Sequence, residues 1–292
     1  MVRMTGAAAP TNIAGLLSRY SIEVNPSDRK ALDAAQGRLR PGTEVFLTWI
    51  PGENPIHLVG AAARLRLAGL LPVPHVAARH VRSSAQLEQL AARLADEAGV
   101  DRILLIGGDR AKPAGPYDSS LAVMQTEVFQ KTGITRMAIA GFPEGNPNIP
   151  ELARDEALQA KVNFAGAAGL QLSIVTQFCF TARPIVVWLQ RIRAQGIDNP
   201  VCVGLAGPAS SATLARYAVR CGIGNSLHEL TEHPSFARLL TEKGPEPIIR
   251  EIALYGGPER NGGLPLGIAG LHFFVFGGFG KTVDWINAQR SG

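Results

Sequence analysis

Short apolar segments alternate along the chain with longer segments whose apolar residues recur at helical spacing. The short segments are rich in Val, Ile and Leu, and most end at glycine, proline or a polar residue, as buried parallel strands do. Eight such strands are predicted, at residues 21–24, 45–48, 71–76, 103–106, 136–140, 170–176, 201–205 and 270–276. Helices are predicted at residues 28–36, 57–68, 83–98, 118–131, 149–165, 184–195, 210–221, 233–243, 247–255 and 281–289.

This alternation predicts one α/β domain, because eight strands that are each followed by a helix are typical of a (β/α)8 TIM barrel. The length of 292 residues also suits this fold. We expect a single barrel domain over residues 16–292, preceded by a flexible N-terminal tail over residues 1–15. A doubly wound sheet is the alternative, but no G-x-G-x-x-G motif follows the first predicted strand.

Composition narrows the class of protein. The hydrophobic fraction of 46% is enough for a large core, and the net charge of +5 is spread along the chain without a basic stripe. This distribution favours an anionic small molecule over nucleic acid as the partner. No stretch is long and apolar enough to span a membrane. The three cysteines have neither zinc nor disulfide spacing, so we expect no metal site and a cytoplasmic protein with reduced thiols. The protein can be a monomer or a homo-oligomer.

Polar side chains recur at or just past the ends of the predicted strands. They are Glu23, Thr48, His75, Asp109, Glu144 and Gln177. The carboxyl ends of barrel strands converge on one mouth, where active sites are built, so we expect these side chains to meet there. Asp109 lies in the stretch that most clearly predicts an active-site loop. Here a buried strand ends at Gly107 and Gly108, and the loop that follows ends at Tyr117.

Each of these residues also has a structural alternative. Glu23 lies between two apolar neighbours in the setting of a general acid, but a strand-end glutamate can equally pair with an arginine. His75 can bind a ring or a phosphate, or can be a buried core histidine. Gln177 can donate and accept hydrogen bonds together, which suits a heteroaromatic ring, or can bridge neighbouring strands. Glu144 is interpreted as a cap of the next helix.

Several short motifs, taken in order, resemble the methylenetetrahydrofolate reductase family, whose members are flavin-dependent (β/α)8 barrels. The similar stretches are SIEVNP at 21–26, PHV at 74–76, GD at 108–109 with GPY at 115–117, FPEGNP at 142–147, KV at 161–162, AGA at 165–167 and TQFCF at 176–180. In the family these read S-F-E-F-F-P-P, P-H-L-T, R-G-D before a loop with a tyrosine, Y-P-E-x-H-P, K-V-D-A-G-A and T-Q-F-F-F. The resemblance runs from about residue 20 to residue 208.

The resemblance implies hydride transfer that interconverts 5,10-methylenetetrahydrofolate and 5-methyltetrahydrofolate, through FAD and with NADH or NADPH as the co-substrate. It implies that Glu23 and Asp109 are catalytic, and that Gln177, Asp109 and Phe178 bind the folate substrate. The residues that it assigns to the cofactor site are Thr48, His75, Gly108, Asp109, Tyr117, Ala140, Phe142, Asn146 and Lys161.

Three positions depart from the family pattern, and each departure removes or weakens a flavin contact. Gly107 stands where the family has an arginine, Phe142 where it has a tyrosine, and Asn146 where it has a histidine. One alternative is therefore a flavin-free enzyme in which NADH passes its hydride directly to the folate. Another is a folate-binding or accessory subunit of one-carbon metabolism without turnover. The sequence does not separate NADH from NADPH, or one direction of the reaction from the other.

Overall fold

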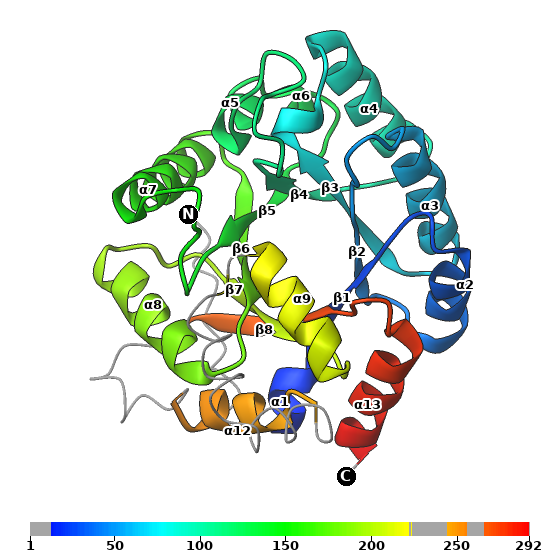
Figure 1. Ribbon diagram of the computed structural model, residues 1–292. Helices are drawn as coiled ribbons and strands as arrows, with labels where there is room; N and C mark the ends of the chain where they lie inside the picture. The colour runs from blue at the N-terminus through cyan, green and yellow to red at the C-terminus, as the bar shows by residue number, and fades with distance from the viewer. Residues whose placement is uncertain (1–12, 222, 224–243, 256–265, 292) are drawn as a thin grey trace.

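Eight parallel strands pair in chain order and close into a barrel (Figure 1). The computed structural model describes residues 13–221, 223, 244–255 and 266–291. The strands are β1 (Tyr20–Val24), β2 (Glu44–Leu47), β3 (Leu71–Ala77), β4 (Arg102–Ile106), β5 (Arg136–Gly141), β6 (Gln171–Phe178), β7 (Val201–Ala206) and β8 (Ile268–Phe274). The predicted (β/α)8 fold is confirmed, and each predicted strand overlaps an observed one.

Helices surround the barrel (Figure 1). They are α1 (Ile13–Ser18), α2 (Arg29–Arg38), α3 (Ile56–Leu67), α4 (Ser84–Asp96), α5 (Ser120–Met124), α6 (Val128–Lys131), α7 (Glu151–Ala167), α8 (Ala182–Ala194), α9 (Ser211–Cys221), α12 (Glu246–Tyr255) and α13 (Phe279–Ser291), with a 3₁₀ turn η1 (Ala78–His80) after β3. Of the expected tail, residues 1–12 lie outside the described residues, and α1 begins at Ile13. Among the described helices, none is long and apolar enough to cross a membrane.

The helix predicted at 118–131 is wrong, because the chain forms two short helices there. Glu127, between α5 and α6, has a left-handed backbone with φ of 56°, which ends a regular helix. The hydroxyl of Thr126 donates to the Val123 carbonyl at 2.7 Å and accepts from the Val128 N–H at 3.3 Å. These bonds satisfy backbone groups that the helix leaves at the break. The helix predicted at 233–243 lies outside the described residues.

The barrel interior is packed with apolar side chains from successive strands. Phe46, Val73, Leu104, Ala138 and Val175, one each from β2 to β6, form a cluster separate from the main core. The main core lies between the strands and the surrounding helices. Because side chains alternate between the two faces of a strand, the interior residues nearest the carboxyl ends are presented at the mouth.

The barrel closes where β1 pairs with β8. Ser21 lies opposite His272, and Tyr20 lies opposite Leu271. This pairing joins the first strand to the last and brings residues from both ends of the sequence to the mouth.

Candidate functional site

Glu23 and two histidines meet inside the barrel near its mouth. Oε2 of Glu23 lies 3.8 Å from Nε2 of His272, and Nδ1 of His272 lies 2.9 Å from Oγ of Ser21. The Glu23 side chain is 17% exposed, whereas that of His272 is 1% exposed. Oε2 of Glu23 is buried and has no hydrogen-bond partner among the described residues. A buried acceptor of this kind is costly unless a ligand or water satisfies it.

His75 lies beside this group and stays neutral. Burial lowers the pKa of its imidazole to about 4, an effect that the Glu23 carboxylate opposes and that His272 reinforces. The ring of Phe46 packs edge-on against both histidines, with centroid distances of 5.9 Å to His75 and 4.5 Å to His272. Nε2 of His75 is buried without a partner in the described part of the chain, so it is available to a ligand.

Gln177 brings a third side chain with unpaired polar atoms to the mouth. Both its amide nitrogen and its amide oxygen are buried and lack a hydrogen-bond partner within the described residues. The pairing of β6 with β7 shifts its register between Val175 and Phe178, and the Thr176 hydroxyl accepts from the Gly204 N–H at 2.8 Å across this irregularity. The Thr176 hydroxyl thereby supplies a hydrogen-bond acceptor for the Gly204 N–H at the irregularity. The Gln177 side-chain amide is available to a ligand that both donates and accepts hydrogen bonds.

Aromatic rings make a wall next to Gln177. The buried ring of Phe178 lies 5.6 Å from that of Phe274 and 5.0 Å from that of Phe276. Tyr217 of α9 stacks on Phe276 at 4.2 Å with an interplanar angle of 28°. Phe276 has a φ of 47°, an uncommon conformation for a bulky residue, which turns the chain sharply after β8. Such a wall suits the face of a planar ring.

Asp109 lies farther out, at the end of β4. Its side chain is 58% exposed, and Oδ1 lies 3.0 Å from Nε2 of the buried His80. Gly108 has a φ of 91°, which favours glycine, and a Cβ there would come within 3.3 Å of the same imidazole nitrogen. Apart from Gly107 itself and its two chain neighbours, no residue comes within 4 Å of the place where a Cβ of Gly107 would stand, so this position opens onto free space.

The remaining residues assigned to a cofactor are spread over several elements. Thr48 follows β2, where its N–H donates to the Val24 carbonyl at 3.2 Å, and Ala140 lies in β5. Phe142 lies in the partly buried loop after β5. Tyr117 is 9% exposed and lines a small cavity with residues of α4 and α6, in the outer layer of the fold.

Lys161 and Asn146 have contrasting surroundings. Lys161 of α7 makes no ion pair within the described residues, and burial lowers the pKa of its amine to about 8. Asn146 uses its side-chain oxygen locally, because that oxygen accepts from the Asn148 N–H at 2.9 Å. The Lys161 ammonium group is therefore free to pair with an anionic ligand. The side-chain oxygen of Asn146 already accepts a hydrogen bond within the turn at residues 146–148.

Glu144 does not cap the next helix as expected, because α7 begins after Pro150 and has no side-chain cap. Glu144 instead contacts Cys179 at the end of β6. The pKa of the Cys179 thiol is raised well above its usual range by burial, and the Glu144 carboxylate that hydrogen-bonds it adds to the effect. Cys179 is therefore a protonated, structural thiol.

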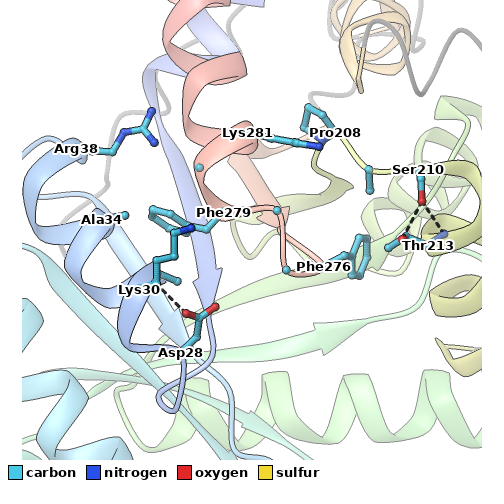
Figure 2. Close-up of a pocket in the computed structure, with 15 residues that line it drawn as sticks. Asp28, Lys30, Ala34, Arg38, Pro208, Ser210, Thr213, Phe276, Phe279 and Lys281 are labelled. Carbon is cyan, nitrogen blue, oxygen red and sulfur yellow. Dashed lines mark hydrogen bonds between the residues drawn. The ribbon is translucent and has the colours of Figure 1, made fainter.

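A cavity of about 480 Å³ lies beside the mouth, between α2, the start of α9 and the turn from β8 into α13 (Figure 2). Lys30 and Lys281 both line it, and Arg38 in the same lining pairs with Asp284. The turn at residues 277–282, whose sequence is similar to a phosphate-binding turn without P-loop spacing, forms most of one wall. None of the residues predicted for the folate or cofactor site lines this cavity.

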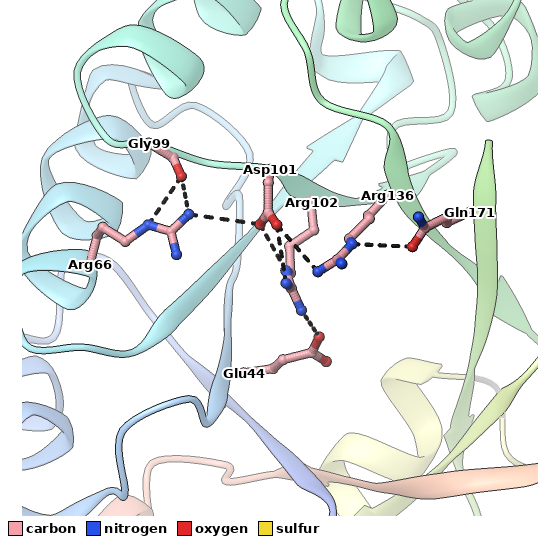
Figure 3. A network of polar contacts seen from close by, with 7 residues as sticks. All are labelled: Glu44, Arg66, Gly99, Asp101, Arg102, Arg136 and Gln171. Carbon is pink, nitrogen blue, oxygen red and sulfur yellow. Dashed lines mark hydrogen bonds and ion pairs between the residues drawn. The ribbon is translucent and has the colours of Figure 1, made fainter. Parts of the chain in front are cut away.

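Charged side chains also cluster at the other end of the barrel, where the strands begin (Figure 3). Arg102 pairs with both Glu44 and Asp101, and Arg136 lies 3.3 Å from Asp101 and 3.2 Å from the Gln171 amide oxygen. Because barrel active sites lie at the carboxyl ends of the strands, we interpret this network as structural.

Comparison with known proteins identifies the family. The sequence model described as methylenetetrahydrofolate reductase matches residues 56–228, which is more than half of the chain. The chain belongs to the methylenetetrahydrofolate reductase family. This membership supports a reductase that acts on a folate. His272 and His80 lie beside the predicted residues Glu23 and Asp109, and Ser21 contacts His272, but none of the three was predicted as a site residue. The sequence signal for His272 is its place in a H-F-F stretch that resembles the family's H-F-Y.

Solved structures with a similar fold have low sequence identity to this family member. Dihydropteroate synthase from Thermus thermophilus is 13% identical, with a TM-score of 0.46 and coverage of 92% of this chain and 93% of that one. The carboxyl transferase domain of Rhizobium etli pyruvate carboxylase is 13% identical, with a TM-score of 0.43 and coverage of 85% and 48%. Membership of the family rests on the sequence match and not on these two likenesses.

Two of the residues assigned to the cofactor are compatible with the flavin that members of the family typically use. Lys161 supplies a partly desolvated cation without a carboxylate partner among the described residues, which is the chemistry that a phosphate requires. The free space at Gly107 leaves room for a ring close to the backbone. Asp109, held at the end of the same strand, would then lie beside that ring.

Proposed function

We propose that this protein interconverts 5,10-methylenetetrahydrofolate and 5-methyltetrahydrofolate by hydride transfer, with FAD as the cofactor and NADH or NADPH as the co-substrate. One observation carries the proposal. The carboxyl of Glu23, the imidazole of His75 and the amide of Gln177 are all buried at one barrel mouth, and each has a polar atom without a partner among the described residues. Such groups are satisfied when a polar ring occupies the mouth.

Gln177 and the aromatic wall suit the pterin ring of the folate. The amide can accept from a ring N–H and donate to a ring nitrogen or oxygen at once. Phe274 and Phe276 are partly exposed and offer apolar surface against which a planar ring can pack, and the buried ring of Phe178 supports both of them. The side chains thereby fix the plane and the edge of the substrate, which is the positioning that hydride transfer demands.

Glu23 is the proposed general acid. It protonates a nitrogen of the imidazolidine ring, which opens the ring to the iminium that accepts the hydride. Ser21 Oγ lies 2.9 Å from Nδ1 of His272, and Nε2 of the same ring faces Oε2 of Glu23 at 3.8 Å. His272 thus places a second proton-carrying group beside the carboxyl inside the barrel.

FAD, when bound, would supply the hydride and be reduced again by NADH or NADPH. Lys161 would pair with its phosphates, and Thr48, His75, Gly108 and Ala140 would line its site. A second candidate is direct transfer of hydride from NADH to the folate without a flavin. The local bond of Asn146 favours it, since the oxygen that would face the cofactor is already engaged.

The visible absorption spectrum of the purified protein, followed by anaerobic addition of 5-methyltetrahydrofolate, tests the proposal. Flavin bands that bleach on addition support the FAD-dependent reaction. A colourless protein that stays colourless with added FAD, yet oxidises NADH when given methylenetetrahydrofolate, supports direct transfer. Absence of folate-dependent redox change in both assays contradicts both enzymatic candidates and leaves a binding subunit.

Replacement of Glu23 by Gln tests the proposed acid. We expect Glu23→Gln to lower kcat by about 100-fold or more, because general acid catalysis contributes roughly that much. Cofactor binding and the melting temperature should change little, since the amide has nearly the same shape. Glu88→Gln, at an exposed position of α4, is the matched control. Turnover of Glu23→Gln at the wild-type rate would show that another group donates the proton.

A further inference from the structure

The loop that follows β4 and carries Asp109 is hydrogen-bonded to the 3₁₀ turn η1, which follows β3. The backbone N–H of Arg79 donates to the Gly107 carbonyl at 2.9 Å, and the Arg79 carbonyl accepts from the Ala114 N–H at 2.9 Å. The Arg79 guanidinium donates to the Asp118 carbonyl at 2.8 Å. The turn therefore holds both the beginning and the end of the loop after β4.

His80, the last residue of this turn, holds the carboxylate itself. Its ring is buried and donates from Nε2 to Oδ1 of Asp109 across 3.0 Å. The ring of Trp49 packs edge-to-face on it at 5.7 Å and an interplanar angle of 89°, which fixes the plane of the imidazole. Gly108 lies against the same ring, so any larger side chain there would push the donor away.

The second ring nitrogen of His80, Nδ1, shows that the ring has only one polar contact among the described residues. Nδ1 is buried and has no hydrogen-bond partner in the described part of the chain, so the single polar contact of this imidazole is with Asp109. Both the imidazolium and the neutral tautomer protonated on Nε2 donate to the carboxylate. Burying a polar imidazole costs free energy, and the one hydrogen bond that the ring makes to a described residue is to the exposed Asp109 carboxylate. We therefore interpret His80 as a residue that holds Asp109 and does not only fill space.

The residues around Asp109 supply a reason for this bond. Gly107 stands two positions before Asp109, where the family has an arginine, so no cationic side chain precedes Asp109 in the loop. Arg110 follows Asp109, but its guanidinium donates to the Lys112 carbonyl at 3.4 Å. We propose that His80 is a positioning residue that fixes the Asp109 carboxylate at the mouth in place of the family's arginine. The inference rests on the proposed function, in which Asp109 lies beside the reacting rings.

A double-mutant cycle with two replacements of His80 tests the inference. His80→Phe keeps an aromatic ring but removes the donor, whereas His80→Gln keeps an N–H at nearly the position of Nε2. We expect His80→Phe to lower kcat/KM by about tenfold, because a hydrogen bond to a charged group has roughly that worth at a partly exposed site. His80→Gln should recover most of the loss, and His80→Phe should have little further effect in Asp109→Asn. Additive losses in the double mutant would overturn the proposal.

A second readout does not depend on turnover. The imidazole nitrogen chemical shifts of His80, measured by NMR, should report a proton on Nε2 in the wild type and should change in Asp109→Asn. Lys112→Ala, at an exposed position of the same loop, should leave them unchanged. Unchanged shifts in Asp109→Asn would overturn the inference even in an active enzyme. A wild type without folate redox activity would refute the proposed function, and the shifts would still decide whether His80 holds Asp109.

Discussion

Replacement of Lys161 by Met is expected to stabilise the protein while weakening its affinity for an anionic ligand. Lys161 lies on α7 with its amine largely buried and without an ionic partner among the described residues. Met has a similar length and no charge, so it can occupy the same space without the cost of desolvating an ammonium group.

The pKa of Lys161 sets the size of the effect. Burial lowers this pKa from its usual 10.5 to about 8 in the folded protein. A shift of that size corresponds to about 3 kcal/mol of unfavourable free energy when the amine is charged. Because the side chain is partly exposed and keeps some hydration, we expect Lys161→Met to raise the free energy of unfolding by about 2 kcal/mol at pH 7.

The dependence on pH follows from the same shift. Below about pH 8 the amine is protonated in the folded and the unfolded state, and the folded state bears the full cost. Between about pH 8 and 10.5 the unfolded state binds more protons than the folded state, so the Lys161 contribution makes the free energy of unfolding rise with pH. The advantage of Lys161→Met should therefore shrink across this window.

Urea unfolding of wild type and Lys161→Met at pH 7 and at about pH 10 measures the difference directly. Comparison of the two proteins at each pH cancels the titration of other groups. Lys131→Met, at an exposed position of α6, is the matched control and should change stability by less than about 0.5 kcal/mol. A Lys161→Met variant that is no more stable than wild type at pH 7 would refute the reasoning.

Two further predictions concern buried polar groups. Arg193→Met should lower the free energy of unfolding by about 3 kcal/mol, seen as a lower urea midpoint, because the buried guanidinium donates to the carbonyls of Leu266 at 3.1 Å and Asn199 at 3.0 Å. The imidazole of His75 should show no NMR titration near pH 6.5, since its pKa is about 4. On acidification the unfolded chain takes up this proton first, so the His75 contribution should lower stability as pH falls from 6.5 to about 4; a titration near 6.5 would contradict its burial.

The strands could be predicted because their local pattern suffices. Each is a short run of apolar and β-branched residues bounded by turn residues, and the alternation with helices leads to a barrel. The position of Glu23, His75 and Gln177 at the barrel mouth could be predicted in the same way, since the carboxyl ends of barrel strands must converge. The single helix predicted at 118–131 was wrong because its apolar spacing does not reveal the left-handed conformation of Glu127.

Partners across the barrel could not be predicted from local pattern. The contact between Ser21 and His272 depends on the register of β1 against β8, and that register exists only in the folded barrel. His80 lies on a short 3₁₀ turn, where one sequence position decides whether a side chain points to the core or to the mouth. The burial that lowers the pKa of Lys161 likewise exists only in the folded protein.

The pairing of β1 with β8 joins residues that are synthesised at very different times. Ser21 and His272 are 251 positions apart, so a chain on the ribosome carries Glu23 long before its histidine neighbour has been synthesised. Contacts of such long sequence separation form late in folding, because the intervening loop must close first. The contact between Glu23 and His272 is therefore completed only after β8 has been made and paired with β1.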